Sequence, residues 1–413
     1  MKSLFLPLLA LLLSTACTRN PKEQIEFTDR EVPELGMTEA QLHNKVLGML
    51  VGSALGDAMG APTEMWSRED INLHYGFVKS LDSMIRDVSP EGIWLPNLPA
   101  GGTTDDTRWK VLTVDYLLSQ KSDELNAKDF AREILNTYES YTEELKSIKG
   151  TESELFESVY LKLGWLQEWA KVSQPFIDEN LVGYADSLGK FYGGEMVCAG
   201  LLYAPALGAY FPGSPEMAYQ EAYKLSFYDL GYAKDISAQA AAMTAAGMKL
   251  EATKEDLLAS LRLDPAKYFE SRLVGRTAYS ILKNALWISA EAAKQDSLGN
   301  QLKEESKALQ FAFAQLDQHL QDMPFHAGEI WLQTLTAMIY SDFDFMGTLI
   351  FLVNYGRDND TTAALAGGIL GAYYGFDNLP KLEREKVIKV NKELLGIDLE
   401  QISNELTAHM LGK

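Results

Sequence analysis

The sequence contains very few cysteine and histidine side chains, with two cysteines and five histidines among 413 residues. They are Cys17 and Cys198, and His43, His74, His319, His326 and His409. The histidines lie far apart and share no metal-ligand spacing, which disfavours a zinc or copper site built from nitrogen and sulfur ligands. If Cys17 is acylated, as predicted below, Cys198 has no partner for an intramolecular disulfide.

Positive charge is also scarce. The chain has 37 Lys and Arg against 58 Asp and Glu, a formal net charge of -21. We therefore expect no nucleic-acid partner and no direct binding to an anionic lipid surface, because both need basic patches. A polyanion can still bind through a metal ion. With 46% hydrophobic and 23% charged residues, the composition is typical of a globular protein with a large core.

The apolar run over residues 4–13 is too short to span a bilayer as a stable helix. It follows Met1-Lys2-Ser3 and precedes small residues that end at Cys17, which is the order of a signal peptide. We predict a signal peptide over residues 1–16. The residues before Cys17 resemble a bacterial lipobox, although Ser14 lies where an aliphatic residue is usual. We therefore predict a lipidated Cys17; plain secretion or a retained anchor is the alternative.

These features predict an exported bacterial cell-envelope lipoprotein, periplasmic or on the cell surface, that contacts the membrane only through its lipid anchor. Residues 17–37 contain Asn20-Pro21, Pro33 and mixed charges, and they predict a tether. No linker divides the remainder, so we predict one domain over residues 38–413.

Helical spacing dominates this domain. Thr38 and Gln41 form a capping-box pattern at the start of a helix that extends to about Met59. Glycines recur at every fourth position of that helix: Gly48, Gly52, Gly56 and Gly60. Such a stripe lets another backbone approach closely, so it predicts a tight contact with another element or a ligand. The later segments lack strand alternation, and we predict an almost all-α fold.

Two short acidic clusters lie about 250 residues apart, each just before an expected helix. They are Thr104-Asp105-Asp106-Thr107 and Asp358-Asn359-Asp360-Thr361. Carboxylate and hydroxyl oxygens suit a hard divalent cation such as magnesium, calcium or manganese. Taken alone, each cluster is also consistent with a simple helix cap and first turn.

The two clusters follow a third motif, Gly-x3-Gly-Asp-Ala-x-Gly-x-Pro-x-Glu, over residues 52–64. The ordered set resembles the ADP-ribosylglycohydrolase family, which includes dinitrogenase reductase-activating glycohydrolase. The motifs extend over residues 48–375. The resemblance implies an all-α orthogonal helical bundle with a central cleft that holds two divalent ions, usually Mg²⁺ and in some members Mn²⁺.

Carried over from the family, the metal ligands would be Thr104, Asp105, Asp106, Asp358, Asp360 and Thr361. Glu64 matches the glutamate that ends the first motif and would lie near the metals, whereas we expect Asp57 to be structural. Hydrolysis of a glycosidic bond needs an activated water and a proton acceptor. Glu64, Asp105 and Asp106 are the candidate catalytic carboxylates, and the spacing does not choose among them.

The expected substrate side departs from the family. The glycine-rich stretch around Gly193 and Gly194 lacks the Met-Arg pair of many members, and Ser226-Phe227 stands where a Thr-His or Ser-His pair is common. Arg357 places a cation beside the second acidic cluster, where it can bind a phosphate or pair with an acid. We predict that Gly193, Gly194 and Arg357 contact the substrate.

Three functions remain open at this point. The first is a metal-dependent hydrolase of an ADP-ribosyl or related ribofuranosyl linkage. The second is an exported hydrolase of a nucleoside or furanosidic glycan on the same fold. The third is a non-catalytic, crystallin-like binding protein, which the complete set of ligand residues disfavours. The sequence does not predict the oligomeric state.

Lipidation is directly testable. Radioactive palmitate should label the protein when it is expressed in a bacterium that processes lipoproteins, and Cys17→Ala should abolish the label, whereas Cys198→Ala should retain it. Equal labelling of the wild type and Cys17→Ala would contradict the predicted anchor.

Overall fold

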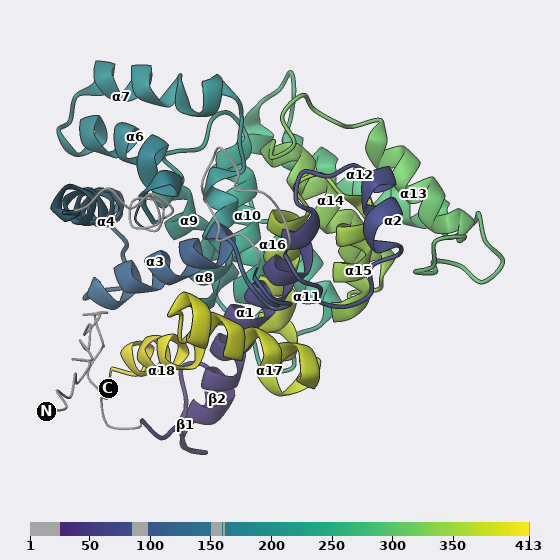
Figure 1. Ribbon diagram of the computed structural model, residues 1–413, viewed down its shortest axis with the longest axis horizontal. Coiled ribbons are helices and arrows are strands. Elements are labelled where there is room, and N and C mark those ends of the chain that lie inside the picture. Colours follow the sequence, from purple (N-terminus) through teal and green to yellow (C-terminus); the bar gives the residue numbers. More distant parts are fainter. Residues whose placement is uncertain (1–24, 85–97, 150–158, 160–161, 413) are drawn as a thin grey trace, which may run out of the picture.

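The computed structural model describes residues 25–84, 98–149, 159 and 162–412 (Figure 1). Within these residues the fold is all-α, and one pair of two-residue strands is the only sheet. The predicted signal peptide, residues 1–16, and Cys17 lie outside the described residues. In the described part of the chain, no helix has both the length and the apolar character that a membrane span requires.

The strands are β1 (Glu31–Val32) and β2 (Met37–Thr38). The α-helices are α1 (Glu39–Gly60), α2 (Arg68–Tyr75), α3 (Asp105–Ser119), α4 (Ala127–Ser147), α6 (Gln167–Ile177), α7 (Leu181–Leu188), α8 (Ala204–Ala209), α9 (Pro215–Leu225), α10 (Ala233–Gly247), α11 (Lys254–Ser260), α12 (Thr277–Ala292), α13 (Lys307–Asp317), α14 (Ala327–Tyr340), α15 (Phe345–Tyr355), α16 (Asn359–Tyr374), α17 (Lys381–Val390) and α18 (Leu399–Met410). Short 3-10 helices are η1 (Ala61–Thr63), η2 (Gly164–Leu166), η3 (Phe191–Gly194), η4 (Ala199–Leu202), η5 (Tyr268–Glu270) and η6 (Phe376–Asn378), and η7 (Asn391–Leu395) is a π-helix.

The predicted capping box starts α1. Gln41 N–H donates to Thr38 Oγ1 over 3.2 Å, and Thr38 N–H donates to Gln41 Oε1 over 2.8 Å. The described part of the predicted tether packs against the same helix, because Phe27 stacks on His43 with ring centroids 4.6 Å apart. β1 and β2 pair antiparallel directly before the helix. The residues before α1 are therefore packed against the domain.

The glycine stripe of α1 is the contact surface for α16. A Cβ added at Gly52 would overlap the carbonyl oxygen of Gly367 and lie 2.9 Å from Cα of Gly371. One added at Gly56 would overlap the carbonyl of Ala363. Only glycine permits this approach of two helix backbones. The stripe therefore marks a tight contact with another element, one of the two interpretations that the sequence left open.

The α1–α16 pair forms the centre of the molecule (Figure 1). Helices α3, α8, α10, α14, α15, α17 and α18 each contact one or both of its members. The residues of α16 from Asn359 to Ala372 are buried, because neighbours surround the helix on all sides. The site described below lies at the end of this pair where α1 stops and α16 starts.

A buried lysine joins the opposite end of α16 to α10. Lys45 Nζ donates to the carbonyl oxygens of Gly247 (2.8 Å), Ala372 (3.0 Å) and Tyr373 (3.1 Å). Cations stabilise helix C-termini, where carbonyl groups lack partners within the helix. Burial lowers the pKa of Lys45 to about 8.

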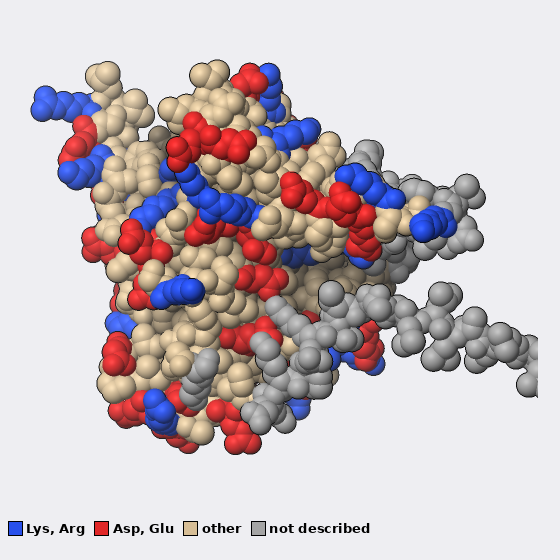
Figure 2. Space-filling model, turned by 90° about the vertical axis from the view of Figure 1, so that its left-hand side faces the viewer, with Lys and Arg blue, Asp and Glu red and all other residues tan. Residues whose placement is uncertain are grey.

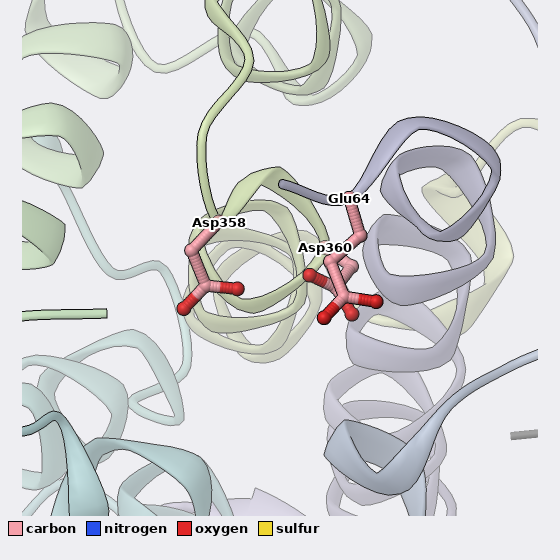
Figure 3. A group of neighbouring side chains, drawn as sticks. All are labelled: Glu64, Asp358 and Asp360. Atoms are coloured by element: carbon pink, nitrogen blue, oxygen red, sulfur yellow. The ribbon is translucent and has the colours of Figure 1, made fainter. Parts of the chain in front are cut away.

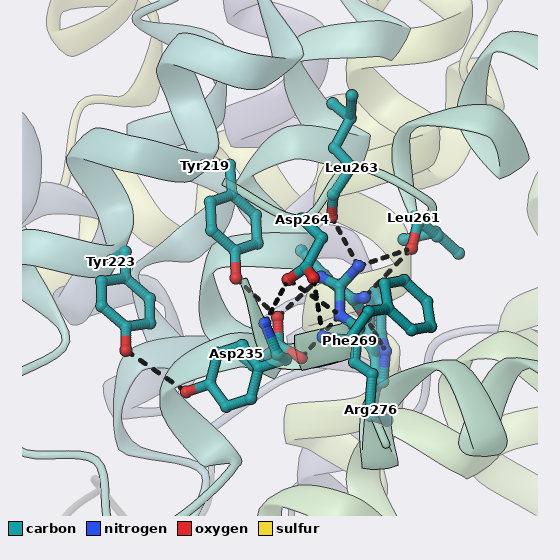
Figure 4. Close-up of polar contacts among 11 residues, drawn as sticks. Tyr219, Tyr223, Asp235, Leu261, Leu263, Asp264, Phe269 and Arg276 are labelled. Carbon is teal, nitrogen blue, oxygen red and sulfur yellow. Dashed lines mark hydrogen bonds and ion pairs between the residues drawn. The ribbon is translucent and has the colours of Figure 1, made fainter. Parts of the chain in front are cut away.

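A second buried cation stabilises the region around α9, α10 and the loop before α12 (Figure 4). The Arg276 guanidinium donates to both oxygens of Asp235, over 2.9 and 2.7 Å, and neither side chain is exposed. Tyr219 donates to Asp235 Oδ1 over 2.7 Å, and Arg276 donates to the carbonyl of Leu263 over 2.5 Å. With these partners the charges are compensated, and the network has a structural role.

On the face drawn in Figure 2, Lys and Arg side chains are scattered among Asp and Glu side chains.

Gly56→Ala tests the close helix contact. The added methyl group has no space, because it would meet the backbone of α16. We expect a loss of about 1–3 kcal/mol in the free energy of unfolding from overpacking, despite the higher helix propensity of alanine, which is worth about 1 kcal/mol. Urea denaturation followed by circular dichroism measures this.

Ser53→Ala is the matched control on the same helix. Its Cβ is already present, and its buried hydroxyl has no hydrogen-bond partner among the described residues. We expect a change of about 0.5 kcal/mol or less, since no contact is lost. Equal stability of Gly56→Ala and Ser53→Ala would contradict the packing described above.

Candidate metal centre

The junction between α1 and α16 brings the Glu64 carboxylate to the start of α16. At Gly60, the last residue of α1, an added Cβ would overlap the backbone of Asp360. η1 follows directly, and Asn359 Nδ2 donates to Thr63 Oγ1 over 2.8 Å. Two segments almost 300 residues apart in sequence are thereby fixed against each other.

A short antiparallel bridge fixes the next residues. Met65 N–H donates to the carbonyl of Arg357 over 2.7 Å, and Arg357 N–H donates to the carbonyl of Trp66 over 3.0 Å. Met65 and Arg357 have φ values of 63° and 64°, which are uncommon for residues other than glycine. The bridge holds Glu64 and Asp358, its immediate neighbours, on adjacent backbone segments.

Glu64, Asp358 and Asp360 form a buried acidic group. One oxygen from each carboxylate lies within 4.8 Å of the other two, and no side chain of the three is more than 3% exposed. Figure 3 shows the three carboxylates pointing to the same side of the α1–α16 junction. Three converging carboxylates are suited to a hard divalent cation.

The first acidic cluster meets the second through reciprocal hydrogen bonds. Thr104 Oγ1 donates to Asp360 Oδ2 over 3.2 Å, and Thr361 Oγ1 donates to Asp106 Oδ2 over 2.9 Å. Asp105 lines the same cavity, described below. The structure thus brings together all six side chains that the family resemblance implied as ligands.

Asp57 positions the first cluster from behind. Its carboxylate accepts from the backbone N–H of Thr104 (2.9 and 3.1 Å) and Thr107 (2.9 Å), and from Thr107 Oγ1 (2.6 Å). These bonds satisfy free N–H groups at the start of α3. Burial, and then the charge of Asp106, raise the pKa of Asp57 to about 6. The structural role expected for Asp57 agrees with these contacts.

Concentrated negative charge shifts the titration of the cluster. Burial and the neighbouring carboxylates Glu64 and Asp106 raise the pKa of Asp358 well above its usual range, and burial together with Asp358 does the same for Asp360. Burial and Asp106 raise the pKa of Asp105 to about 7. The ionised cluster is therefore unfavourable without a compensating positive charge.

One carboxylate oxygen of the cluster indicates where a positive charge could bind. Oδ1 of Asp360 is buried and has no hydrogen-bond partner among the described residues. The side chains of Asp358 and Asp360 share a hydrogen bond while one of them is protonated, but once both are ionised each can only accept. Buried polar atoms are normally paired, so the vacant lone pairs of Asp360 fit direct coordination of a cation.

The acidic group lines a cavity of about 80 Å³ together with Asp105, Asp106, Thr361 and a set of mainly apolar and aromatic residues. The lining residues are Glu64, Met65, Asp105, Asp106, Trp169, Tyr192, Val197, Cys198, Ala199, Leu202, Phe325, Asp358, Asp360 and Thr361. Tyr192 and Phe325 contact each other edge to face, with centroids 5.6 Å apart. The cavity therefore combines carboxylates with aromatic side chains.

The glycine-rich stretch shapes this wall indirectly. Tyr192 has φ 45° and ψ 46°, and Gly193 and Gly194 have φ of 76° and 85°. The two glycines are exposed and do not line the cavity. They form the turn next to Tyr192, whose side chain does line the cavity. The structure therefore assigns them a turn-forming role, and their contact with the substrate stays a prediction.

Arg357 forms an ion pair with an acidic side chain, which is the second of the two roles expected for it. Its guanidinium donates to Glu329 over 2.8 and 3.0 Å and to the carbonyl of Gln321 over 2.8 Å. The residues that line the cavity do not include Arg357.

Lys110 is the residue of this site that sequence reasoning missed. Its ammonium group donates to Asp106 Oδ1 over 3.0 Å, and the two side chains are only 2% and 3% exposed. The signal was present, because Asp106 and Lys110 are four residues apart on one helix, where such pairs face each other. The aromatic wall gave no comparable signal, because Trp169, Tyr192 and Phe325 come from three separate segments.

The sequence model of the family described as ADP-ribosylglycohydrolase matches residues 38–412. The chain belongs to the ADP-ribosylglycohydrolase family. The membership inferred from the three motifs is confirmed, as is the all-α fold of that family.

Two individual proteins are similar to this chain. A solved structure described as "ADP-ribosylglycohydrolase-related protein complex" is similar with a TM-score of 0.53 and 18% identity, over 89% of this chain and 98% of that chain. At this identity the likeness shows the fold alone. "Uncharacterized protein YegU" of Escherichia coli (strain K12) is 50% identical over 34 residues, which are 8% of this chain and 10% of that protein. The chain thus matches about a tenth of the length of that relative.

The raised pKa values predict an unusual pH dependence of stability. A carboxyl whose pKa is higher in the folded than in the unfolded protein stabilises the fold fully below its unfolded pKa of about 4, and this stabilisation is lost as the pH rises through the folded pKa. For Asp105 the folded pKa is about 7. We therefore expect metal-free protein to lose stability between about pH 4 and pH 7.

Urea unfolding at pH 5 and pH 8, in EDTA and in saturating Mg²⁺, measures this effect. Mg²⁺ should reduce the loss at pH 8, because a bound cation favours the ionised form of its ligands. Asp360→Asn should reduce both the pH dependence in EDTA and the stabilisation by Mg²⁺. Identical pH profiles with and without Mg²⁺ would contradict the assignment of this cluster as a metal site.

Proposed function

We propose that this protein is a metal-dependent hydrolase that cleaves an ADP-ribosyl or related ribofuranosyl glycosidic linkage. The observation that carries the proposal is the unpartnered Asp360 oxygen within a buried carboxylate group that faces an aromatic-walled cavity. Family membership supports the same reaction class. The substrate is then an ADP-ribosylated molecule or another ribofuranoside.

The donor atoms fit the cation that the family implies. Carboxylate and hydroxyl oxygens favour Mg²⁺, with Mn²⁺ as the alternative. Thr104, Asp105, Asp106, Asp358, Asp360 and Thr361 are the side chains that would hold it. When bound, a divalent ion supplies a site that orients ribose hydroxyls and lowers the pKa of a water molecule.

The hydrogen bonds narrow the choice of proton acceptor. Asp106 accepts from Lys110 at one oxygen and from Thr361 at the other, so it is held in a fixed orientation. Glu64 and Asp105 remain as the carboxylates that take the proton from water at the cavity surface. The carboxylate group also stabilises positive charge that develops on the ribosyl ring in the transition state.

One observation favours a substrate without a diphosphate. Among the described residues, those that line the cavity include no Lys or Arg, although basic side chains commonly bind phosphate groups. This supports the second candidate function, hydrolysis of a nucleoside or a furanosidic glycan. The predicted leader supports it too, because export would place the enzyme among extracytoplasmic substrates as a cell-envelope lipoprotein.

Replacing both acids of the first cluster tests the assigned chemistry. Asp105→Asn with Asp106→Asn preserves side-chain shape and removes two negative charges. We expect kcat/KM to fall by about 10²- to 10⁴-fold, the usual contribution of a general acid or base. A screen of ADP-ribosyl-arginine, ADP-ribosyl-serine, nucleosides and furanosides with Mg²⁺ or Mn²⁺ identifies the substrate for this measurement.

Asp123→Asn with Glu124→Gln is the matched control, since these adjacent acids are exposed on the loop after α3. The control should retain wild-type turnover, and circular dichroism should show both double variants folded. Wild-type turnover by the Asp105/Asp106 variant would refute the proposed chemistry. Absence of turnover for every substrate class would instead favour a binding protein.

A further inference from the structure

A single-turn π-helix near the end of the chain lies against both segments that lead into the acidic site. This turn is η7, and it closes with a hydrogen bond from the Gly396 N–H to the Asn391 carbonyl, the i to i+5 spacing of a π-helix. π-Helical turns are rare and occur frequently at functional sites. The described residues that line the cavity include none from η7, so its influence on the site passes through its neighbours.

Asn391 fixes the segment that leads into α3. Its side chain is fully buried. Oδ1 accepts from Thr103 Oγ1 over 2.5 Å, and Nδ2 donates to the carbonyl of Gly101 over 3.2 Å. Nδ2 also donates to the carbonyl of Val387 in α17 over 2.9 Å. The asparagine thus joins α17 to residues 101–103 through both polar atoms of its side chain.

The opposite end of the same turn contacts η1. Leu395 packs against a small apolar cluster that includes Ala61 and Leu98. Ala61 is the first residue of η1, and Glu64 is the C-cap of that short helix. Five consecutive residues therefore contact the segment before the first acidic cluster and the segment before Glu64.

Thr104 follows directly after the residue that Asn391 holds. Its backbone N–H donates to Asp57 Oδ1 over 2.9 Å, and its hydroxyl donates to Asp360 Oδ2 over 3.2 Å. These bonds fix Thr104 against α1 and α16. Thr103 is fully buried as well, and its hydroxyl bond to Asn391 fixes the preceding residue against the C-terminal segment. Together the contacts determine where the first turn of α3 begins.

We propose that Asn391 is a positioning residue of the metal site. Through Thr103 and Gly101 it places Thr104 and the first acidic cluster for cation binding. This inference rests on the proposed function in requiring that the acidic site binds a divalent cation. Residues that orient metal ligands without touching the metal typically contribute about 10- to 100-fold to metal affinity.

Mn²⁺ titration of the metal-stripped full chain by isothermal titration calorimetry tests the proposal without an activity assay. Thr103→Val replaces the hydroxyl by a methyl group of similar size and should weaken Mn²⁺ binding by about 10-fold. Thr103→Ser keeps the hydroxyl and should bind Mn²⁺ as the wild type does. Asn391→Ala removes all three side-chain hydrogen bonds and should weaken binding by about 10- to 100-fold.

A double variant and a matched control separate positioning from general destabilisation. If Thr103 and Asn391 act through one bond, Thr103→Val should add little to the loss in Asn391→Ala, because residues in contact are not additive. Asn300→Ala is the control. Its amide donates to Ser289 Oγ over 3.3 Å and to the carbonyl of Tyr340 over 3.2 Å, between α12 and α14, and its loss should leave the Mn²⁺ affinity unchanged.

The outcomes separate this inference from the proposed function. Wild-type Mn²⁺ affinity in Thr103→Val, or equal losses in Thr103→Val and Thr103→Ser, would overturn the role of Asn391 and leave the metal-dependent hydrolase intact. Equal losses in Asn391→Ala and Asn300→Ala would also overturn it. If Asn391→Ala does not fold, the two Thr103 variants decide. No Mn²⁺ binding by the wild type would overturn both proposals.

Discussion

The close contact between α1 and α16 is the constraint on which the site depends. Glycines at every fourth position of α1 let its backbone lie against the small residues of α16. Because the two helices meet so closely, the end of one and the start of the other converge at Gly60 and Asp360. Glu64, three residues after η1 begins, therefore faces the second acidic cluster.

Electrostatics follows from this packing. Burial at the centre of an all-α core concentrates carboxylates where water cannot solvate them, which raises the pKa values of Asp358 and Asp360. The fold compensates these charges unevenly among the described residues: backbone N–H groups donate to Asp57, an ammonium group donates to Asp106, and Asp360 accepts from the Thr104 hydroxyl at Oδ2 while its Oδ1 has no donor. A bound cation would supply the positive charge that the carboxylates of this site require.

Helical periodicity was sufficient to predict the fold class and the ordered motifs were sufficient to predict the family, and the pairing of the two acidic clusters followed from the family resemblance. The glycine stripe predicted a close contact but not its partner, since pairing between distant helices leaves no mark in spacing alone. Tyr192, Phe325 and Trp169 were missed for the same reason. Lys110 was different, because its spacing of four residues from Asp106 was visible in the sequence. Only the structure shows that the pair is buried.

The central claim is that the junction of α1 and α16 assembles a cation site at the acidic group of Glu64, Asp358 and Asp360. Anomalous X-ray diffraction from crystals grown with Mn²⁺ tests it most directly, because the scattering locates the metal independently of any assumed ligand. The account predicts a strong anomalous peak at this group, with oxygen atoms of Asp358 and Asp360 at about 2.0–2.2 Å, the distance range of a small hard divalent ion. A peak elsewhere in the molecule, or none at saturating Mn²⁺, would contradict it.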